Sequence, residues 1–164
     1  MTVDSNALRA TMRQWVTGVT VVTTAFEGVR AGMTVSSFTS VSLEPPTILV
    51  CLNKNAFAHN LVKQAGIFGV SLLASEQAAL SQRFAGLEPG LSGDRFEGVP
   101  YIIAKTGAPL LEGVVGMLDC VVSAAHDAST HTIYIGEVVY AQAFPERKPL
   151  IYYNRQYQNL VPQG

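Results

Sequence analysis

The sequence predicts one mainly β domain spanning residues 1–164, an antiparallel barrel with a few short helices. Three observations support this prediction. Runs of strand length that are rich in Val, Ile and Thr recur along the chain. Helical spacing of apolar residues is confined to short stretches, and the regular strand–helix alternation of a parallel sheet is absent. At 164 residues, such a domain has enough length to bury a core.

The N-terminal segment predicts a short amphipathic helix. Leu8, Met12 and Trp15 fall at helical spacing. Asp4 or Ser5 precedes them as a candidate cap for the first helical turn.

Residues 16–24 are rich in Val and Thr and predict a strand, which a tight turn at Glu27–Gly28 returns into residues 32–46 as a hairpin. In this second strand, alternate side chains point to opposite faces. One face carries Met33, Val35, Val41 and Leu43, and the other carries Thr34, Ser36, Ser40 and Ser42. The hydroxyl face suits a polar, partly aromatic ligand, because each hydroxyl donates or accepts a hydrogen bond. From the pattern alone, the solvated face of an ordinary barrel strand is the favoured interpretation, because Ser and Thr are common on half-exposed strands.

Pro45–Pro46 ends this strand, and residues 47–52 predict the next one. A helix follows that ends at Gly66, with an apolar stripe of Ala58, Leu61, Val62 and Ala65. The junction before it consists of Asn53, Lys54 and Asn55. Free backbone N–H groups and the Lys54 ammonium would attract an anion there, whereas an Asn would serve equally as a plain helix cap.

The remaining chain predicts further strands and one more helix. These elements are a strand over 68–72, a helix from Ser75 to about Phe84, an irregular loop over 86–98, a hairpin of strands over 110–122 and 132–143, and an aromatic segment over 150–157.

The composition excludes several classes of function. Eleven Lys and Arg against twelve Asp and Glu give a net charge of −1 without a basic cluster, so nucleic-acid binding is not expected. The apolar runs fall short of the about 20 residues that a membrane span needs, and the N-terminus lacks the apolar core of a signal peptide. We therefore expect a cytoplasmic protein without membrane contact. The hydrophobic share of 48% is high, so part of the apolar surface is expected to close a subunit interface.

The sequence carries no motif for a metal, a bound triphosphate or hydrolysis. Cys51 and Cys120 lie far apart and predict two buried thiols. His126 and His131 have a spacing that matches no zinc site. GxGxxG, P-loop and G-x-S-x-G patterns are absent.

A set of short motifs follows one order along nearly the whole chain. They are Thr17-Gly18-Val19-Thr20-Val21-Val22-Thr23-Thr24, Gly32-Met33-Thr34-Val35-Ser36-Ser37-Phe38 with Ser40-Val41-Ser42-Leu43 and Pro45-Pro46, Arg83-Phe84-Ala85-Gly86, Asp94-Arg95-Phe96, and His131-Thr132-Ile133-Tyr134-Ile135-Gly136-Glu137-Val138. Each motif alone is weak. As an ordered set they resemble the flavin reductase family, the small partners of two-component flavin-dependent monooxygenases.

The resemblance implies an FMN-binding split barrel that assembles as a homodimer with flavin sites at the subunit interface. It also implies an NAD(P)H:flavin oxidoreductase, which passes a hydride from NADH or NADPH to FMN or FAD and supplies reduced flavin to a partner monooxygenase. The two cofactors carry this chemistry, so the protein needs to stack and orient them and requires no catalytic base. The choice between the two flavins and between the two nicotinamides stays open.

The matched positions assign residues to such a site. The segment along the isoalloxazine ring and ribityl chain is matched by Thr34, Val35, Ser36 and Ser37, and the pyrimidine side of the ring by Ser40, Val41 and Ser42. The segment that reaches the flavin phosphate is matched by Asn53, Lys54 and Asn55, the segment near the flavin tail by Arg83 and Phe84, and the dinucleotide path by Tyr152, Arg155 and Tyr157. His131 matches the histidine near the nicotinamide and is the candidate catalytic residue.

Two departures from the family pattern affect this assignment. Ser or Thr usually follows the phosphate segment, whereas this chain has Ala56-Phe57-Ala58-His59, which makes His59 the candidate donor to the phosphate. Gly-Asp commonly precedes the family histidine, whereas Ser129-Thr130 precedes His131, so the imidazole lacks its expected orienting carboxylate. As simpler alternatives, Arg83 lies on a solvated helix end, Phe84 is a core residue and His131 caps a turn.

Two other functions compete with a reductase. A flavin-binding module without turnover would use the same barrel as a flavin store, sensor or docking module. A relative of pyridoxamine-phosphate oxidase is disfavoured, because the central hydroxyl segment and residues 131–138 both resemble the reductase branch.

Overall fold

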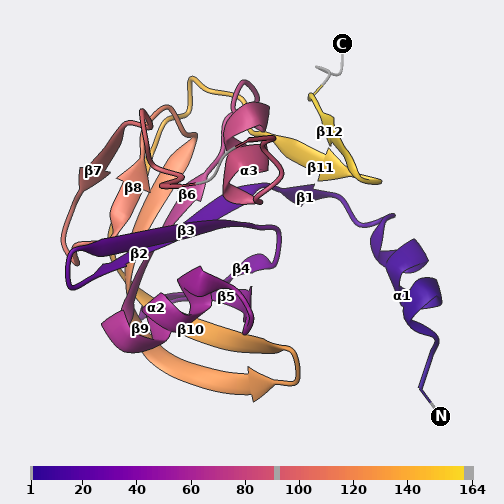
Figure 1. Cartoon of the computed structure of the whole chain (residues 1–164), viewed down its shortest axis with the longest axis horizontal. Coiled ribbons are helices and arrows are strands. Elements are labelled where there is room, and N and C mark those ends of the chain that lie inside the picture. Colours follow the sequence, from indigo (N-terminus) through magenta and orange to yellow (C-terminus); the bar gives the residue numbers. More distant parts are fainter. Residues whose placement is uncertain (1, 91–92, 161–164) are drawn as a thin grey trace.

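The computed structural model describes residues 2–90 and 93–160, in which strands outnumber helices (Figure 1). The helices are α1 (Ser5–Met12), α2 (Phe57–Ala65) and α3 (Ala78–Phe84). The strands are β1 (Thr17–Gly18), β2 (Thr20–Phe26), β3 (Val29–Val35), β4 (Phe38–Leu43), β5 (Pro46–Asn53), β6 (Ile67–Leu72), β7 (Tyr101–Ile103), β8 (Pro109–Leu111), β9 (Gly116–Ala128), β10 (His131–Ala143), β11 (Ile151–Tyr153) and β12 (Gln156–Gln158).

Seven strands form one antiparallel sheet in the order β3-β2-β6-β9-β10-β5-β4. Its two edge strands, β3 and β4, are consecutive in the chain and joined only by Ser36–Ser37, so the sheet has to curl until its edges approach each other. On the β4 side of this seam the backbone N–H of Cys51 on β5 donates to the Ser37 carbonyl at 3.1 Å, which extends the β4–β5 pairing by one residue. The predicted antiparallel barrel is therefore confirmed, and the two serines lie where it is split.

Two apolar clusters form the core. The first includes Val22, Val50, Phe68, Val70 and Tyr134 from four strands of the barrel. The second includes Val21, Phe84, Phe96, Leu110 and Leu150 and joins the barrel to α3 and the β7–β8 hairpin. Gly136 on β10 is required by this packing, because a Cβ there would lie 2.5 Å from the Phe68 ring.

The locally encoded elements agree with the sequence. The Asp4 carboxylate caps α1 by accepting from the backbone N–H groups of Asn6 and Ala7 at 3.2 and 3.3 Å. Glu27 and Gly28 have φ of 48° and 79° and form the turn between β2 and β3. Gly66 ends α2 with φ of 67° in the left-handed conformation. The predicted β9–β10 hairpin is also confirmed.

Two predicted features are wrong. Residues 32–46 are not one strand, because a bend at Ser36–Ser37 divides them between β3 and β4. The buried apolar face continues through Val35 but ends there, and Leu43 on β4 is 84% exposed. Ser75 does not cap α3, which begins three residues later with Gln77 in the cap position and no side-chain cap.

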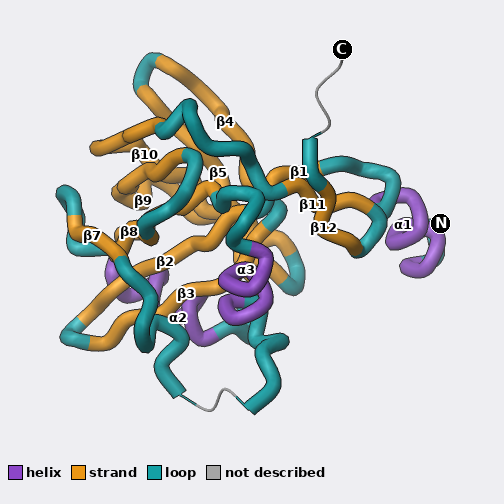
Figure 2. Tube along the Cα trace, turned by 90° about the horizontal axis from the view of Figure 1, so that it is seen from above, coloured by secondary structure: helices purple, strands orange, loops and turns teal. Residues whose placement is uncertain are grey.

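The N-terminal arm lies beside the barrel rather than in its core. None of the residues of α1 is buried, and the helix projects away from the sheet (Figure 1). Seen from above, α1 follows the small sheet β1-β11-β12 at the side of the molecule (Figure 2). The arm is tied to that sheet by hydrogen bonds from Asn154 N–H to the Arg13 carbonyl and from the Tyr153 hydroxyl to the Gln14 amide, at 3.1 and 3.0 Å. No helix among the described residues has the length and apolarity needed to cross a membrane.

Candidate functional site

Three cavities follow one another along residues 30–39. The first, of about 640 Å³, lies at the seam and is lined by Ser36, Ser37, Phe38, Thr39, Cys51 and Tyr152, together with residues of α1. The second, of about 190 Å³, is lined by Thr34, Ser36, Ser81, Tyr152 and Tyr157. The third, of about 400 Å³, is lined by Gly32, Met33, Arg95 and the start of α2. Ser36 and Tyr152 line both the first and the second cavity, so these two adjoin, and the third begins one residue further along β3.

Hydroxyl groups join the elements around the second cavity. The Thr34 hydroxyl donates to the Ser81 carbonyl on α3 at 2.6 Å, and the Tyr157 hydroxyl donates to the Ser81 hydroxyl at 2.9 Å. Ser37 donates its hydroxyl to the Cys51 carbonyl at 3.0 Å, beside the seam and in line with the β4–β5 pairing. The Ser36 side chain is exposed and makes no hydrogen bond to the rest of the described chain, so it is free to bond a ligand.

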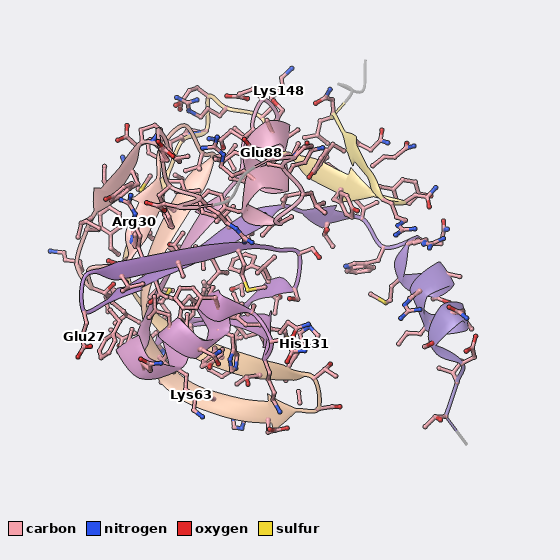
Figure 3. All side chains as sticks on the ribbon, viewed as in Figure 1. Glu27, Arg30, Lys63, Glu88, His131 and Lys148 are labelled. Atoms are coloured by element: carbon pink, nitrogen blue, oxygen red, sulfur yellow. The ribbon has the colours of Figure 1, made fainter. Side chains whose placement is uncertain are left out.

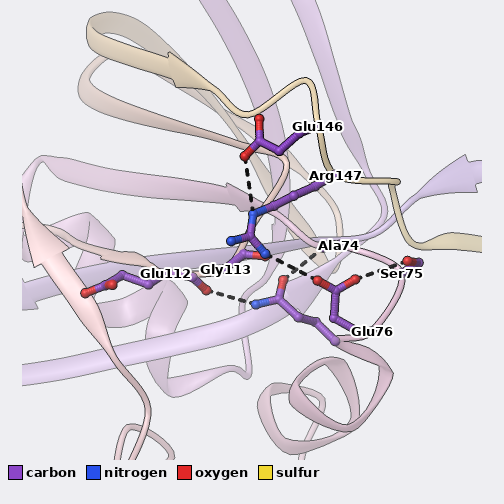
Figure 4. Close-up of polar contacts among 8 residues, drawn as sticks. Ala74, Ser75, Glu76, Glu112, Gly113, Glu146 and Arg147 are labelled. Atoms are coloured by element: carbon purple, nitrogen blue, oxygen red, sulfur yellow. Dashed lines mark hydrogen bonds and ion pairs between the residues drawn. The ribbon is translucent and has the colours of Figure 1, made fainter.

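Two tyrosines form an aromatic side of the site, and polar contacts hold the chain segment that precedes them. Tyr152 and Tyr157 pair on the β11–β12 hairpin, with ring centroids 5.6 Å apart. The chain that leads into β11 is held by Arg147, which donates to the Gly113 carbonyl and to Glu76 at 3.2 and 3.3 Å (Figure 4). In the same cluster Gln77 bonds the Glu112 carbonyl at 2.9 Å (Figure 4). These contacts connect the residues just before α3, the β8–β9 loop and the segment that leads into β11.

His131 lies at the tip of the β9–β10 hairpin, on the side of the barrel that faces α1 (Figure 3). It pairs in register with Asn53, the last residue of β5. A nitrogen of its ring, Nδ1, is 2.9 Å from the Thr130 hydroxyl. The Thr130 hydroxyl therefore contacts the imidazole in place of the orienting carboxylate that the sequence lacks. His126, which the sequence placed between strands, instead lies within β9 opposite Ile133.

Lys54 is engaged at the same hairpin tip. Its ammonium is 2.5 Å from the Asp127 carboxylate, and its backbone N–H donates to the Thr130 carbonyl at 3.0 Å. The hydrogen bond from Lys54 lowers the pKa of the Asp127 carboxyl, which favours the carboxylate beside the ammonium. The cation predicted to meet a phosphate thus already has an acidic partner.

The first cavity is positively charged at its outer end. Arg9, Arg13 and Arg155 line it, and none of its lining residues is acidic. Trp15, Phe38 and Tyr152 supply flat apolar surface beside them. Guanidinium groups bind phosphates, and aromatic faces stack on flat rings, so this cavity has the groups that a dinucleotide needs. The uncharged hydroxyl and aromatic centre at Ser36 likewise fits a flavin ring.

The structure does not bring every predicted residue to these cavities. Ser40, Val41 and Ser42 lie on β4 beyond Thr39, and the Ser42 hydroxyl accepts from the Glu44 N–H at 3.1 Å. His59 is only 6% exposed, with its Nε2 atom 2.9 Å from the Thr132 hydroxyl. It belongs to α2 and its ring packs against Tyr134 of β10, so in this position its imidazole cannot reach a phosphate at the helix start.

The two predicted flavin-tail residues have structural roles. Phe84 is fully buried and makes an edge-to-face contact with Phe96 at a centroid distance of 5.0 Å. It cannot touch a ligand, so the core alternative is correct for this residue. Arg83 is bound to the Glu88 carboxylate at 2.6 Å and to the Glu97 carbonyl at 2.8 Å, which ties α3 to the loop that follows it.

Sequence reasoning missed several lining residues. Arg9 and Arg13 stand four residues apart on one face of the N-terminal helical segment, a signal that was present in the sequence. Arg95 stood in the Asp94-Arg95-Phe96 motif, to which the sequence assigned no role, and Ser81 carried no signal, because only the folded chain brings α3 and residues 93–96 to β3.

Both cysteines are free thiols in the structure. Burial raises the pKa of the Cys120 thiol to about 12, which keeps it protonated. Cys51 is half-buried and lines the first cavity. Among the described residues, no three His, Cys, Asp or Glu side chains are grouped so that they could hold a metal ion.

Comparison with known proteins identifies the family. The model of the flavin reductase like domain matches residues 12–161, nearly the whole chain. The protein belongs to the flavin reductase family. Solved structures of flavin reductases share the fold described above.

Relatives of known activity match the chain from end to end. The reductase subunit HsaB of a flavin-dependent monooxygenase from Rhodococcus jostii is 34% identical over 160 residues, covering 98% of this chain and 80% of that protein. The NADH-dependent FAD reductase of Streptomyces globisporus is 35% identical over 164 residues, covering 98% and 88%. The FMN reductase (NADH) RutF of Agrobacterium fabrum is 39% identical over 142 residues, covering 87% and 80%.

Solved structures of flavin reductases have the same fold. The NADH:FAD oxidoreductase SgcE6 of Streptomyces globisporus superposes with a TM-score of 0.89 at 35% identity and covers 99% of this chain and 98% of that one. SgcE6 in complex with NAD and FAD fragments superposes with a TM-score of 0.88 at 34% identity, covering the same shares. The predicted split-barrel fold class is thereby confirmed.

Proposed function

We propose that this protein is an NADH-dependent flavin reductase, which transfers a hydride to FMN or FAD and supplies the reduced flavin to a separate monooxygenase. The observation that carries the proposal is the row of cavities along residues 30–39, in which an uncharged hydroxyl and aromatic centre adjoins an arginine-lined cavity. Two relatives, an NADH-dependent FAD reductase and an FMN reductase that uses NADH, support NADH as the hydride donor and FAD or FMN as the hydride acceptor.

The residues act by holding two flat rings in contact. When bound, the nicotinamide and the flavin supply the hydride chemistry. The Ser36 hydroxyl is free to bond the polar edge of a ring, while Tyr152 gives it an apolar wall. Arg9, Arg13 and Arg155 bind dinucleotide phosphates at the outer end. His131, oriented by Thr130, lies at the neighbouring hairpin tip and donates a hydrogen bond to the nicotinamide end of the site. Such positioning converts a bimolecular step into an effectively unimolecular one.

The protein is further proposed to work as a homodimer. Leu8, Met12 and Trp15 on the N-terminal arm are 53%, 55% and 67% exposed, and Val41 and Leu43 on β4 are 52% and 84% exposed. Apolar side chains exposed this densely mark an interaction surface. A second copy of the chain that covers the arm and β4 would also close the first cavity, because the arm forms one of its walls. The single domain over residues 1–164 and the cytoplasmic location stay predictions from the sequence.

Anaerobic spectroscopy tests the reductase proposal. The purified protein is mixed with FMN or FAD, NADH or NADPH is added, and the flavin absorbance band is followed. Fast bleaching by NADH with either flavin supports the proposal. A flavin that binds but is not bleached by either nucleotide contradicts it and supports the flavin-binding module. Light scattering of the same sample tests the homodimer.

A further inference from the structure

Lys54 is turned away from the third cavity. That cavity is lined by the residues that follow Lys54, Asn55 through Ala58, but not by Lys54 itself. Its ammonium is directed to the β9–β10 hairpin, where Asp127 neutralises its charge at 2.5 Å. An anion in the third cavity would therefore meet a lysine that is both turned away and already paired.

The start of α2 offers this cavity backbone donors and the neutral side-chain amide of Asn55, but no cation. Ala56 occupies the cap position and makes no side-chain hydrogen bond. Phe57 and Ala58 follow it, so their N–H groups have no partner within the helix and no hydroxyl stands beside them. Backbone N–H groups at a helix start favour an anion modestly. A phosphate there needs a cation from another element.

Three charged residues line the third cavity: Arg30, Asp94 and Arg95. Arg30 forms an ion pair with Asp94, so these two charges cancel. Arg95 donates from Nη1 to the Phe84 carbonyl at 2.7 Å and to the Gly32 carbonyl at 3.4 Å, both neutral acceptors. It makes no ion pair with any acidic side chain in the described part of the chain. The cavity thus has one uncompensated positive charge, on Arg95.

The guanidinium of Arg95 is held in place with donors to spare. Only Nη1 of its five-donor fork is used by the two carbonyls, which leaves Nε and Nη2 available. Gly86 makes room for the group, because a Cβ at this position would lie 2.8 Å from Nη2. A fixed, half-buried guanidinium loses little side-chain entropy on binding a phosphate bidentately.

We propose that Arg95, and not Lys54, is the cation that binds the phosphate of the flavin, and that Asp127 keeps Lys54 out of this role. The inference rests on the proposed flavin reductase function and assigns a task to the Asp94-Arg95-Phe96 motif. Gly32 in the third cavity and Ser36 at the ring end of the site are four residues apart along an extended segment, a separation of about 13 Å. A ligand with a flat ring at one end and a phosphate at the other fits this arrangement.

Flavin binding without NADH tests the proposal. The dissociation constants of riboflavin, which has no phosphate, and of FMN are measured by flavin fluorescence with the whole chain. Arg95→Gln is expected to weaken FMN binding about tenfold, the effect of losing a charge-assisted hydrogen bond, and to leave riboflavin binding unchanged. Lys54→Gln should change the FMN-to-riboflavin ratio less than about twofold. Lys63→Gln, which removes the same charge from the far end of α2, is the matched control (Figure 3).

Two results would overturn the proposal: an FMN-specific loss in Lys54→Gln that is absent from Arg95→Gln, or an equal loss of riboflavin and FMN in Arg95→Gln. Should Arg95→Gln fail to fold, Arg95→Lys and the wild type decide. We expect Arg95→Lys to keep part of the preference for FMN, and inorganic phosphate to compete with FMN but not with riboflavin in the wild type. Equal affinity of the wild type for both flavins contradicts the inference. These ratios are independent of turnover, so failure of the reductase function would be seen separately in the NADH assay.

Discussion

Strands β3 and β4 carry the two halves of one hydroxyl-rich segment, yet their side chains differ in burial. On β3, Val35 is 5% exposed and Thr34 is bonded to α3. On β4, which begins three residues later, Val41 is 52% and Leu43 is 84% exposed. The same alternation of apolar and hydroxyl residues thus forms a packed wall in one strand and an open edge in the other.

The difference lies in what covers each strand. Helices α2 and α3 both pack on β3, whereas β4 packs chiefly against its neighbour β5. Alternation in a sequence states which side chains share a face, but coverage by other elements decides whether that face is buried. We therefore infer that β3 stabilises the barrel by packing against the helices. In the proposed homodimer, β4 contacts a second copy of the chain.

Removing the packing beneath β3 is expected to have the largest effect. The Phe84 ring lies under Gly32, so close that a Cβ at residue 32 would be 2.7 Å from it. Phe84→Ala should lower the free energy of unfolding by about 3–5 kcal/mol, measured by urea denaturation, because it leaves a cavity in the core. Phe57→Ala, at a side chain that is 63% exposed, is the control and should cost much less. A loss below about 1 kcal/mol in Phe84→Ala would contradict the assignment.

Charging β4 should break the dimer and leave the barrel folded. Val41→Lys combined with Leu43→Lys places two cations on a surface proposed to be covered, where burying an unpaired charge is costly. We expect the dissociation constant of the dimer, measured by analytical ultracentrifugation, to rise at least about tenfold, with little change in urea denaturation of the monomer. Val29→Lys alters an equally apolar residue at the far end of β3, 48% exposed, and should not affect assembly. Dimer loss in Val29→Lys alone would place the interface elsewhere.

Thr34 and Thr39 allow a matched test of the hydroxyl row. The Thr34 hydroxyl donates to the Ser81 carbonyl at 2.6 Å, whereas Thr39 on β4 bonds only its neighbour's carbonyl, at 3.3 Å. Thr34→Val should lower the free energy of unfolding by about 1 kcal/mol, because it removes a donor from a partly buried carbonyl. Thr39→Val should change it by less than about 0.5 kcal/mol. Equal losses in urea denaturation would mean that β3 is no better anchored than β4.

Sequence reasoning succeeded where structure is encoded locally. The cap at Asp4, the turn at Glu27–Gly28 and the helix end at Gly66 each follow from the chemistry of a few consecutive residues. The barrel itself followed from strand-length periodicity and from the absence of strand–helix alternation.

Site residues were harder to predict, because their roles depend on partners distant in sequence. Lys54 is held by Asp127, 73 residues away, and His59 is bonded to Thr132, also 73 residues away. Neither contact is visible in a local motif, so both residues were predicted to bind phosphate. Thr130 shows the reverse case: the sequence lacked the expected carboxylate, and the hydroxyl that takes its position became evident only from its distance to the His131 ring.

The smallest expected effect concerns the ion pair that fastens β3 to the loop after α3. The hydrogen bond from Arg30 lowers the pKa of the Asp94 carboxyl from its ordinary value of 3.8. A carboxyl with a lowered pKa stabilises the fold above its unfolded-state pKa, and that contribution disappears as the pH falls through the folded-state pKa. The two side chains are 33% and 44% exposed, so solvent screening limits the pair to less than about 1 kcal/mol.

Asp94→Asn keeps the acceptor for the Phe96 N–H and removes only the charge. Urea denaturation should show a constant small deficit from about pH 7 to about pH 5, which shrinks toward about pH 3 as the wild-type carboxyl is protonated. Glu44→Gln, at the end of β4, removes a carboxylate that forms no ion pair among the described residues and should cost nothing. A stability deficit in Asp94→Asn that persists undiminished at about pH 3 would mean that Asp94 stabilises the fold by packing and not by its charge. Charge would then not explain a difference in stability between β3 and β4.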